Sequence, residues 1–185
     1  MILPGAVLLP GTLLPLFVFE PRYRAMLAEA LASHRLFGIS SSPAAETDPE
    51  VLGIAGIGFV RACVANPNGT SNLVLQGIGR VHLEEWVSPS EYPLARIESV
   101  ETPSVEESVL SSRREEVLEL ISRREEKGMT LPAHFLDALR QTEDPGSLAD
   151  LGASNFIEDA DMRQGLLEEA DPLKRLDTLI DYLKK

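Results

Sequence analysis

The stretch Pro10-Gly-Thr-Leu-Leu-Pro-Leu-Phe-Val-Phe-Glu-Pro-Arg-Tyr-Arg-Ala-Met-Leu27 decides how the first part of this chain folds. Its apolar run, residues 13–19, predicts a strand, and the first charge follows at Glu20. Pro21 then favours the first position of a helix, because the N–H that proline lacks would have no intrahelical partner there. The stretch therefore predicts a strand, an abrupt Glu-Pro corner and a helix that begins at Pro21.

The residues after the corner predict how the helix is held. Tyr23, Met26 and Leu27 recur at helical spacing, so we expect them to join the helix to the sheet. Glu20 suits the positive end of the helix dipole, and it is spaced to pair with Arg24 one turn further on. The corner is thus interpreted as structural rather than as a ligand contact.

The chain up to about Thr102 is rich in sequence patterns that predict strands. Six further runs predict strands, at residues 6–9, 36–40, 51–65, 71–76, 80–87 and 92–100. Glycine weakens a strand, so Gly53, Gly56 and Gly58 in one run indicate either sharp coiling or close backbone approach, as at a barrel corner. Residues 66–69, Asn-Pro-Asn-Gly, are typical of a hairpin turn, and residues 77–79, Gly-Ile-Gly, predict a second turn.

After Pro103 the pattern changes to a helical period. Ser104 and Glu107 have the spacing of a capping box, which predicts a helix start at Ser104. Glu119 is placed to pair with Arg123 on that helix. Four further helices are expected to begin near Pro132, Asp144, Asp161 and Asp171. The chain is therefore predicted to be α+β, with a β-rich part over residues 1–103 and a helical bundle over residues 104–185.

Charge and cysteine content exclude several classes of function. The net charge of −12 divides into −4 for residues 1–103 and −8 for residues 104–185. Both parts would repel nucleic acid and an anionic membrane surface, so neither is an expected partner. Cys63 is the single cysteine, which allows no internal disulfide and suits a cytoplasmic location. The uncharged first 19 residues do not read as a signal peptide, because no basic residue precedes them and prolines interrupt them.

Several segments, taken in order, resemble the N-terminal (LON) domain of ATP-dependent Lon proteases and stand-alone proteins built from it. They are the corner at residues 10–27, Val51-Leu-Gly-Ile-Ala55, Leu75-Gln-Gly-Ile-Gly-Arg80, Asp144-Pro-Gly-Ser-Leu-Ala-Asp-Leu151, and Arg163-Gln-Gly-Leu-Leu-Glu-Glu-Ala-Asp171 with Lys174-Arg-Leu176. The resemblance implies a PUA-like pseudo-barrel followed by a helical bundle. It also implies a role in selecting protein substrates.

The sequence offers no recognisable catalytic machinery. No glycine is followed by lysine, so a Walker loop is absent, and no Gly-x-Ser-x-Gly elbow occurs. The four lysines, at 127, 174, 184 and 185, are predicted to be exposed, and His34, His82 and His134 lack metal-ligand spacing. The adjacent acidic pairs, such as Glu84-Glu85, are interpreted as solvated faces, and Cys63 as a structural thiol. We therefore expect no enzyme activity, no cofactor and no metal.

Trp86 and Tyr92 are the candidate peptide-binding residues. The alternation of the strand places Trp86 on one face with His82 and Glu84, so it could be partly exposed. Equally, Trp86 could cover the seam between the two parts. The sequence thus favours a non-catalytic module that binds unfolded polypeptides or a specific protein partner. Two alternatives remain open: a hydrolase with a dispersed site, and a PUA-like module for small molecules or RNA.

Overall fold

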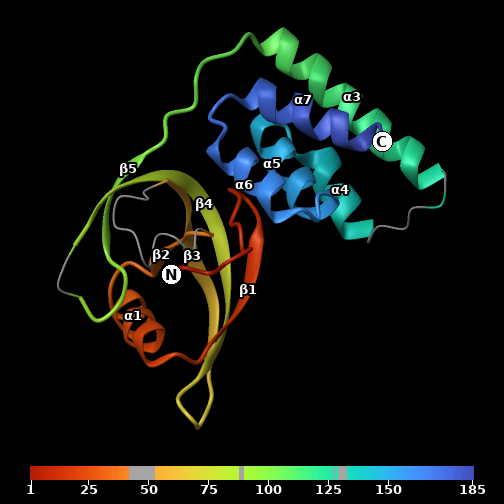
Figure 1. Cartoon of the computed structure of the whole chain (residues 1–185). Coiled ribbons are helices and arrows are strands. Elements are labelled where there is room, and N and C mark those ends of the chain that lie inside the picture. The colour runs from red at the N-terminus through yellow and green to blue at the C-terminus, as the bar shows by residue number, and fades with distance from the viewer. Residues whose placement is uncertain (42–52, 88–89, 127, 129–132) are drawn as a thin grey trace. The chain divides into compact units, whose positions relative to one another are not determined.

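The computed structural model describes residues 1–41, 53–87, 90–126, 128 and 133–185. Its described part is α+β, with one antiparallel five-stranded sheet and six helices (Figure 1). The strands are β1 (Leu13–Val18), β2 (Leu36–Ile39), β3 (Ile54–Ala65), β4 (Ser71–Trp86) and β5 (Ala95–Ser99). The helices are α1 (Pro21–Ala32), α3 (Glu107–Glu126), α4 (Ala133–Gln141), α5 (Pro145–Phe156), α6 (Ala160–Glu168) and α7 (Pro172–Leu183). The predicted fold class is confirmed.

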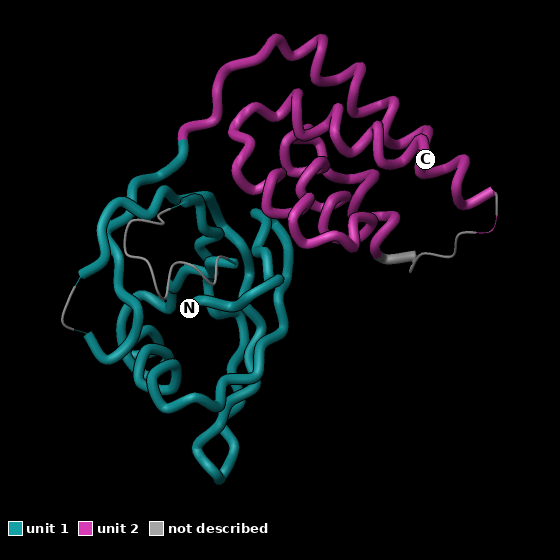
Figure 2. Tube along the Cα trace, in the orientation of Figure 1, with its two compact units in different colours: residues 1–100 teal, residues 101–185 magenta. Residues whose placement is uncertain are grey.

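The chain forms two compact units, residues 1–100 and residues 101–185 (Figure 2). Unit 1 contains the whole sheet and α1, and unit 2 contains the other helices. The boundary lies after Val100, whereas the sequence pattern placed it at residue 103. Among the described residues, no helix combines the length and the apolar character that a membrane crossing requires.

The sheet of unit 1 has the order β1-β4-β3-β2, and β5 also pairs with β4. The long strands β3 and β4 form a hairpin through the turn at residues 66–69, where Gly69 adopts a φ of 80°. That turn was predicted, but the turn expected at residues 77–79 was wrong, because β4 runs through it without ending. The pairing with β3 shifts register beside Ile57 and Gly58, which absorbs an extra residue as a β-bulge.

The Glu-Pro corner has the predicted form. Pro21 is the first residue of α1 and Glu20 occupies its N-cap position. The expected pairing of Glu20 with Arg24 was wrong: Glu20 binds Arg22 instead, with 3.0 Å between Oε2 and Nε. The guanidinium of Arg24 lies over the hairpin turn, where a Cβ on Gly69 would overlap it.

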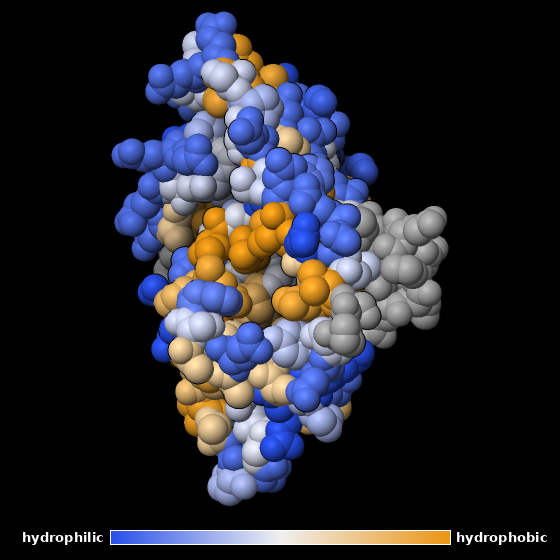
Figure 3. All heavy atoms as spheres, turned by 90° about the vertical axis from the view of Figure 1, so that its left-hand side faces the viewer, coloured by the Kyte–Doolittle hydropathy of each residue, from blue (hydrophilic) through white to orange (hydrophobic). Residues whose placement is uncertain are grey.

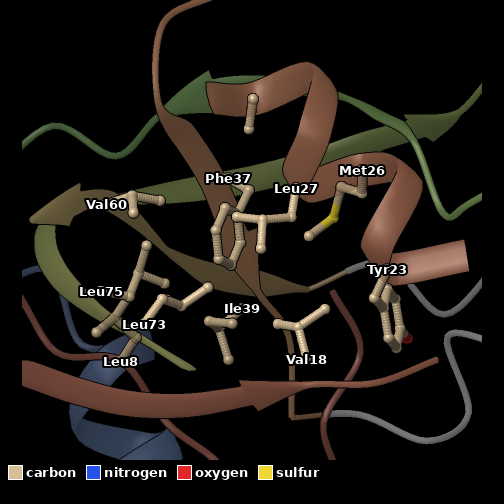
Figure 4. Close-up of a cluster of buried hydrophobic side chains, with 11 residues drawn as sticks. Leu8, Val18, Tyr23, Met26, Leu27, Phe37, Ile39, Val60, Leu73 and Leu75 are labelled. Carbon is tan, nitrogen blue, oxygen red and sulfur yellow. The ribbon is translucent and has the colours of Figure 1, made fainter. Parts of the chain in front are cut away.

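The core of unit 1 lies between α1 and the sheet. Tyr23, Met26 and Leu27 are all buried, and they point from the helix toward side chains of the strands (Figure 4). The Tyr23 hydroxyl also contacts the backbone N and O of Ile2, both at 3.2 Å. These contacts confirm that the helix is joined to the sheet through the three predicted residues.

Two glycines explain how the segment before β1 crosses the sheet. A Cβ on Gly56 would lie 2.0 Å from the carbonyl oxygen of Leu8, and one on Gly77 would lie 2.2 Å from that of Leu9. Only glycine permits backbones to approach so closely. The close approach predicted from the glycines is therefore present at Gly56, whereas Gly53 has no neighbour within 4 Å. The strand expected at residues 6–9 was wrong, because this segment packs on the sheet without joining its ladder.

Unit 2 is a helical bundle in which α4, α5, α6 and α7 begin near the predicted residues. Asp144, Asp159 and Asp171 each occupy an N-cap position and accept a hydrogen bond from a backbone N–H in the first turn. The predicted ion pair between Glu119 and Arg123 is present at 2.7 Å.

The capping box at Ser104 was wrong. α3 begins at Glu107, and the carbonyl of Glu106 accepts the first helical hydrogen bond, from the N–H of Leu110. The Ser108 hydroxyl bonds to the Glu106 side chain beside this start. Ser104 lies before the helix, in an extended connection, where it has no first-turn N–H to cap.

Candidate functional site

The described part of unit 1 contains an apolar pocket of about 330 Å³. It lies between α1, the strands β2 to β5 and the segment that leads into β5. Its lining residues include Glu29, His34, Leu83, Trp86, Tyr92 and Ile97. Figure 3 shows a hollow surrounded by orange, apolar side chains on the side of the molecule that carries β5 and α1 in Figure 1.

A β-bulge places Trp86 in this pocket. The pairing of β4 with β5 shifts register between Leu83 and Glu85, so the alternation of side chains changes there. Trp86 therefore joins Val81 and Leu83 in the pocket wall. The prediction that Trp86 shares a face with His82 and Glu84 was wrong, because a plain alternation cannot anticipate the bulge. The ring is half-buried, and its Nε1 is buried with no hydrogen-bond acceptor in the described part of the chain.

Tyr92 closes one side of the pocket through a hydrogen bond to α1. Its hydroxyl donates to Oε2 of Glu29 at 2.6 Å, across 63 residues of sequence. This hydrogen bond raises the pKa of Tyr92 to about 12, and burial and the charges of Glu29 and Glu91 add to the shift. The phenol therefore stays protonated at neutral pH, and the Glu29 carboxylate remains as an exposed negative charge at the pocket.

The other polar groups at the pocket are tied into the backbone. Nδ1 of His34 accepts a hydrogen bond from the N–H of Leu36 at 3.0 Å. The Met1 amino group donates to the carbonyl of Gly38 at 2.8 Å, and burial, with a contribution from the Arg22 charge, lowers its pKa to about 5.

Ser40 also lines the pocket. Among the described residues, Ser40, His34 and Glu29 are not joined by hydrogen bonds into a relay that could activate a nucleophile. Such a pocket can bind apolar groups, but it does not present an assembled acyl-transfer site.

The structure brings together the two residues that the sequence singled out. Trp86 and Tyr92 line the same pocket, although their role in peptide binding stays a prediction. Sequence reasoning missed Glu29, which reads as one solvated residue of an amphipathic helix. Its position opposite Tyr92 follows from the packing of α1, and no local pattern signals it. Among the described residues, no group of three or more His, Cys, Asp and Glu side chains is placed to hold a metal ion.

A second apolar surface lies on the outer face of the sheet. The register places Phe17, Asn72 and Val64 in one row across β1, β4 and β3. The side chains of Phe17 and Val64 are 55% and 64% exposed, so apolar groups on this face are in contact with solvent. Phe17 also stacks on Phe19, with ring centroids 5.9 Å apart.

Comparison with known proteins defines the class of protein to which this fold and pocket belong. The profile of the ATP-dependent protease La (LON) substrate-binding domain matches residues 1–185. The chain therefore belongs to this family, as the resemblance of its segments predicted. It is 31% identical over 195 residues to the Lon protease of Anaeromyxobacter dehalogenans and 29% identical over 189 residues to that of Geobacter metallireducens. These matches cover 99% and 97% of this chain but 22% of each relative, so the chain corresponds to one domain of those proteases.

Solved structures show the same fold. The N-terminal domain of the Mycobacterium avium complex Lon protease matches all of this chain and 96% of its own, with a TM-score of 0.75 and 21% identity. A Lon N-terminal domain protein from Xanthomonas campestris matches 97% of this chain and 95% of its own, with a TM-score of 0.67 and 18% identity.

Proposed function

We propose that this chain binds exposed segments of polypeptides and leaves them chemically unchanged. The single observation that carries the proposal is the apolar pocket of unit 1, found in a chain that belongs to a substrate-binding family. Unfolded proteins expose the apolar side chains that such a pocket would shield from water. The single cysteine suits an encounter with these ligands in the cytoplasm.

The affinity should be modest. A segment that enters the pocket would bury on the order of 600 Å² of mostly apolar surface, which is small for a protein interface. Ordering a flexible chain offsets much of the gain, so we expect dissociation constants of about 1 μM or weaker. Weak binding suits a module that samples many segments and releases most of them.

The groups at the pocket support binding rather than hydrolysis. Glu29 is engaged by Tyr92, and the Nδ1 atom of His34 is occupied by a backbone N–H, so neither is arranged to pass a proton to the other. The net charge of −12 disfavours RNA as the ligand, although the fold resembles PUA-like modules.

Calorimetric titration with a permanently unfolded protein tests the proposal. Reduced and carboxymethylated α-lactalbumin should bind, whereas the same protein with its disulfides intact should not. A gel of the same mixture, with and without ATP and magnesium, should show the ligand intact. Cleavage that persists after repurification and disappears on mutation of one serine would contradict the non-catalytic reading. If titrations with several unfolded proteins give no heat of binding, general binding of polypeptide segments is contradicted. Binding of one specific protein partner would then be the remaining function.

A further inference from the structure

The size of the pocket limits what can enter it. Its volume of about 330 Å³ lies at the lower end of the range for ligand pockets, about 300–1,000 Å³. The walls contributed by the sheet are apolar, with Ile57, Leu83 and Ile97 among them. This space suits two bulky apolar side chains of a short segment, and it is too small for a folded element.

The acidic and basic side chains that line the described part of the pocket are of one sign. Glu29 lines the pocket and is exposed, and Glu91 lies near enough to act on the Tyr92 hydroxyl. No lysine or arginine is found among the lining residues of the described part. Arg22, whose charge acts on the Met1 amino group, is held by Glu20 at 3.0 Å. A positive charge on the ligand would therefore meet a carboxylate at the mouth of an apolar hollow.

We propose that the pocket selects segments in which a pair of bulky apolar residues is flanked by arginine or lysine. This inference rests on the function proposed above and adds its selectivity. The apolar pair would occupy the hollow between α1 and the sheet, and the basic side chain would lie beside the carboxylate of Glu29. An acidic residue in the basic position would be repelled by Glu29 and Glu91.

Three capped peptides without tryptophan test the selectivity on the full chain. They carry Phe-Leu-Arg, Phe-Leu-Glu or Ser-Ser-Arg between identical Gly-Ser flanks, and binding is measured by calorimetry. The Phe-Leu-Arg peptide should bind about fivefold more tightly than the Phe-Leu-Glu peptide, which is the size of effect expected for an exposed ion pair and an avoided repulsion. The Ser-Ser-Arg peptide should bind at least about tenfold more weakly than Phe-Leu-Arg, because both apolar anchors are gone. Salt at about 1 M should remove most of the preference for arginine, since the Debye length falls to about 3 Å.

Matched variants locate the effect. Glu29→Gln keeps an acceptor for the Tyr92 hydroxyl but removes the charge, so it should abolish the preference for arginine over glutamate. Glu98→Gln removes the same charge from an exposed position in β5 and should leave the preference intact. Leu83→Gln should weaken binding of both Phe-Leu peptides at least about fivefold, whereas Phe17→Gln on the outer face of the sheet should not. Circular dichroism and thermal melting confirm that each variant is folded.

The outcomes separate this inference from the general function. Equal binding of the arginine and glutamate peptides, or a preference that survives Glu29→Gln, would overturn the selectivity while polypeptide binding stands. Binding that is lost in Phe17→Gln and kept in Leu83→Gln would move the site to the outer sheet face and overturn the inference. Failure of both the peptides and the unfolded protein to bind would overturn the proposed function as well.

Discussion

At the scale of single residues, hydrogen bonding to a carboxylate sets the properties of Tyr92. The hydrogen bond to Glu29 raises the pKa of Tyr92 to about 12. The phenol therefore stays protonated at pH values above the ordinary tyrosine pKa of about 10. The shift favours the protonated form in the folded state. Its contribution to stability is therefore present below the unfolded pKa of about 10, and it is lost as the pH rises through the folded pKa.

This shift can be measured directly. With tyrosines labelled at Cζ, NMR should show Tyr92 still mainly protonated at about pH 11, well above the ordinary tyrosine pKa of about 10. Removal of the acceptor in Glu29→Ala should lower the pKa of Tyr92, so that it is mainly ionised at that pH. A midpoint that does not move in Glu29→Ala would show that the hydrogen bond is not the main cause.

A second prediction at this scale concerns the glycines beneath the segment before β1. In Gly56→Ala the new Cβ would lie 2.0 Å from the Leu8 carbonyl oxygen, so the backbone must shift. We expect this shift to lower the free energy of unfolding by about 3 kcal/mol. Gly79→Ala is the matched control, because its nearest neighbour would be the Cγ2 atom of Ile57 at 3.5 Å, an ordinary contact. Gly79→Ala should change the free energy of unfolding by less than about 1 kcal/mol. Urea denaturation followed by circular dichroism compares the two, and equal midpoints would contradict the close approach.

At the scale of elements, a buried ion pair connects α5 with α7. The Arg175 and Asp150 side chains are 4% and 3% exposed, with 3.5 Å between Nε and Oδ1. Arg175 also donates through Nη1 to the carbonyls of Glu169 and Ala170, at 3.0 and 3.2 Å. The guanidinium thus joins the start of α7 to α5 and to the turn that precedes α7.

Loss of that guanidinium should be costly. Arg175→Ala removes the guanidinium from beside a buried carboxylate and should lower the free energy of unfolding by about 3–5 kcal/mol. Arg140→Ala removes an exposed pair with Glu125 and should change it by less than about 1 kcal/mol. Thermal melting of both variants provides the comparison. Similar decreases in melting temperature would show that the buried pair contributes no more to stability than the exposed pair.

Elements also show where sequence reasoning succeeds and where it ends. The corner at Pro21 and the caps at Asp144 and Asp171 were predictable, because each rests on the local chemistry of adjacent residues. The continuity of β4 was not, because a bulge is decided by pairing between strands and not by the Gly-Ile-Gly sequence itself. Ser104 shows the converse: it has the spacing of a capping box with Glu107, yet α3 begins only at Glu107.

The candidate site was predictable only in part for the same reason. Trp86 and Tyr92 stand out as large, amphipathic side chains in a chain with few aromatic residues. Their meeting in one pocket depends on a bulge in β4 and on the packing of α1, both of which are long-range features. Glu29 belongs to the site through that packing alone.

At the scale of the whole molecule, the described residues that line the pocket all belong to unit 1. We propose that polypeptide binds in this pocket and not on the exposed outer face of the sheet. Trp86 is the sole tryptophan of the chain and lines the pocket, so its fluorescence reports on occupancy of the pocket itself.

The most direct test is to titrate the full chain with an unfolded polypeptide that lacks tryptophan, such as reduced and carboxymethylated ribonuclease A. The emission of Trp86 and its quenching by acrylamide are recorded at each addition. We expect a saturable change in Trp86 emission and a fall in quenching, because the bound segment covers the ring. We expect neither change with the folded form of the same protein. Calorimetric binding of the unfolded polypeptide with no change in Trp86 emission or quenching would contradict the claim that the pocket is the binding site.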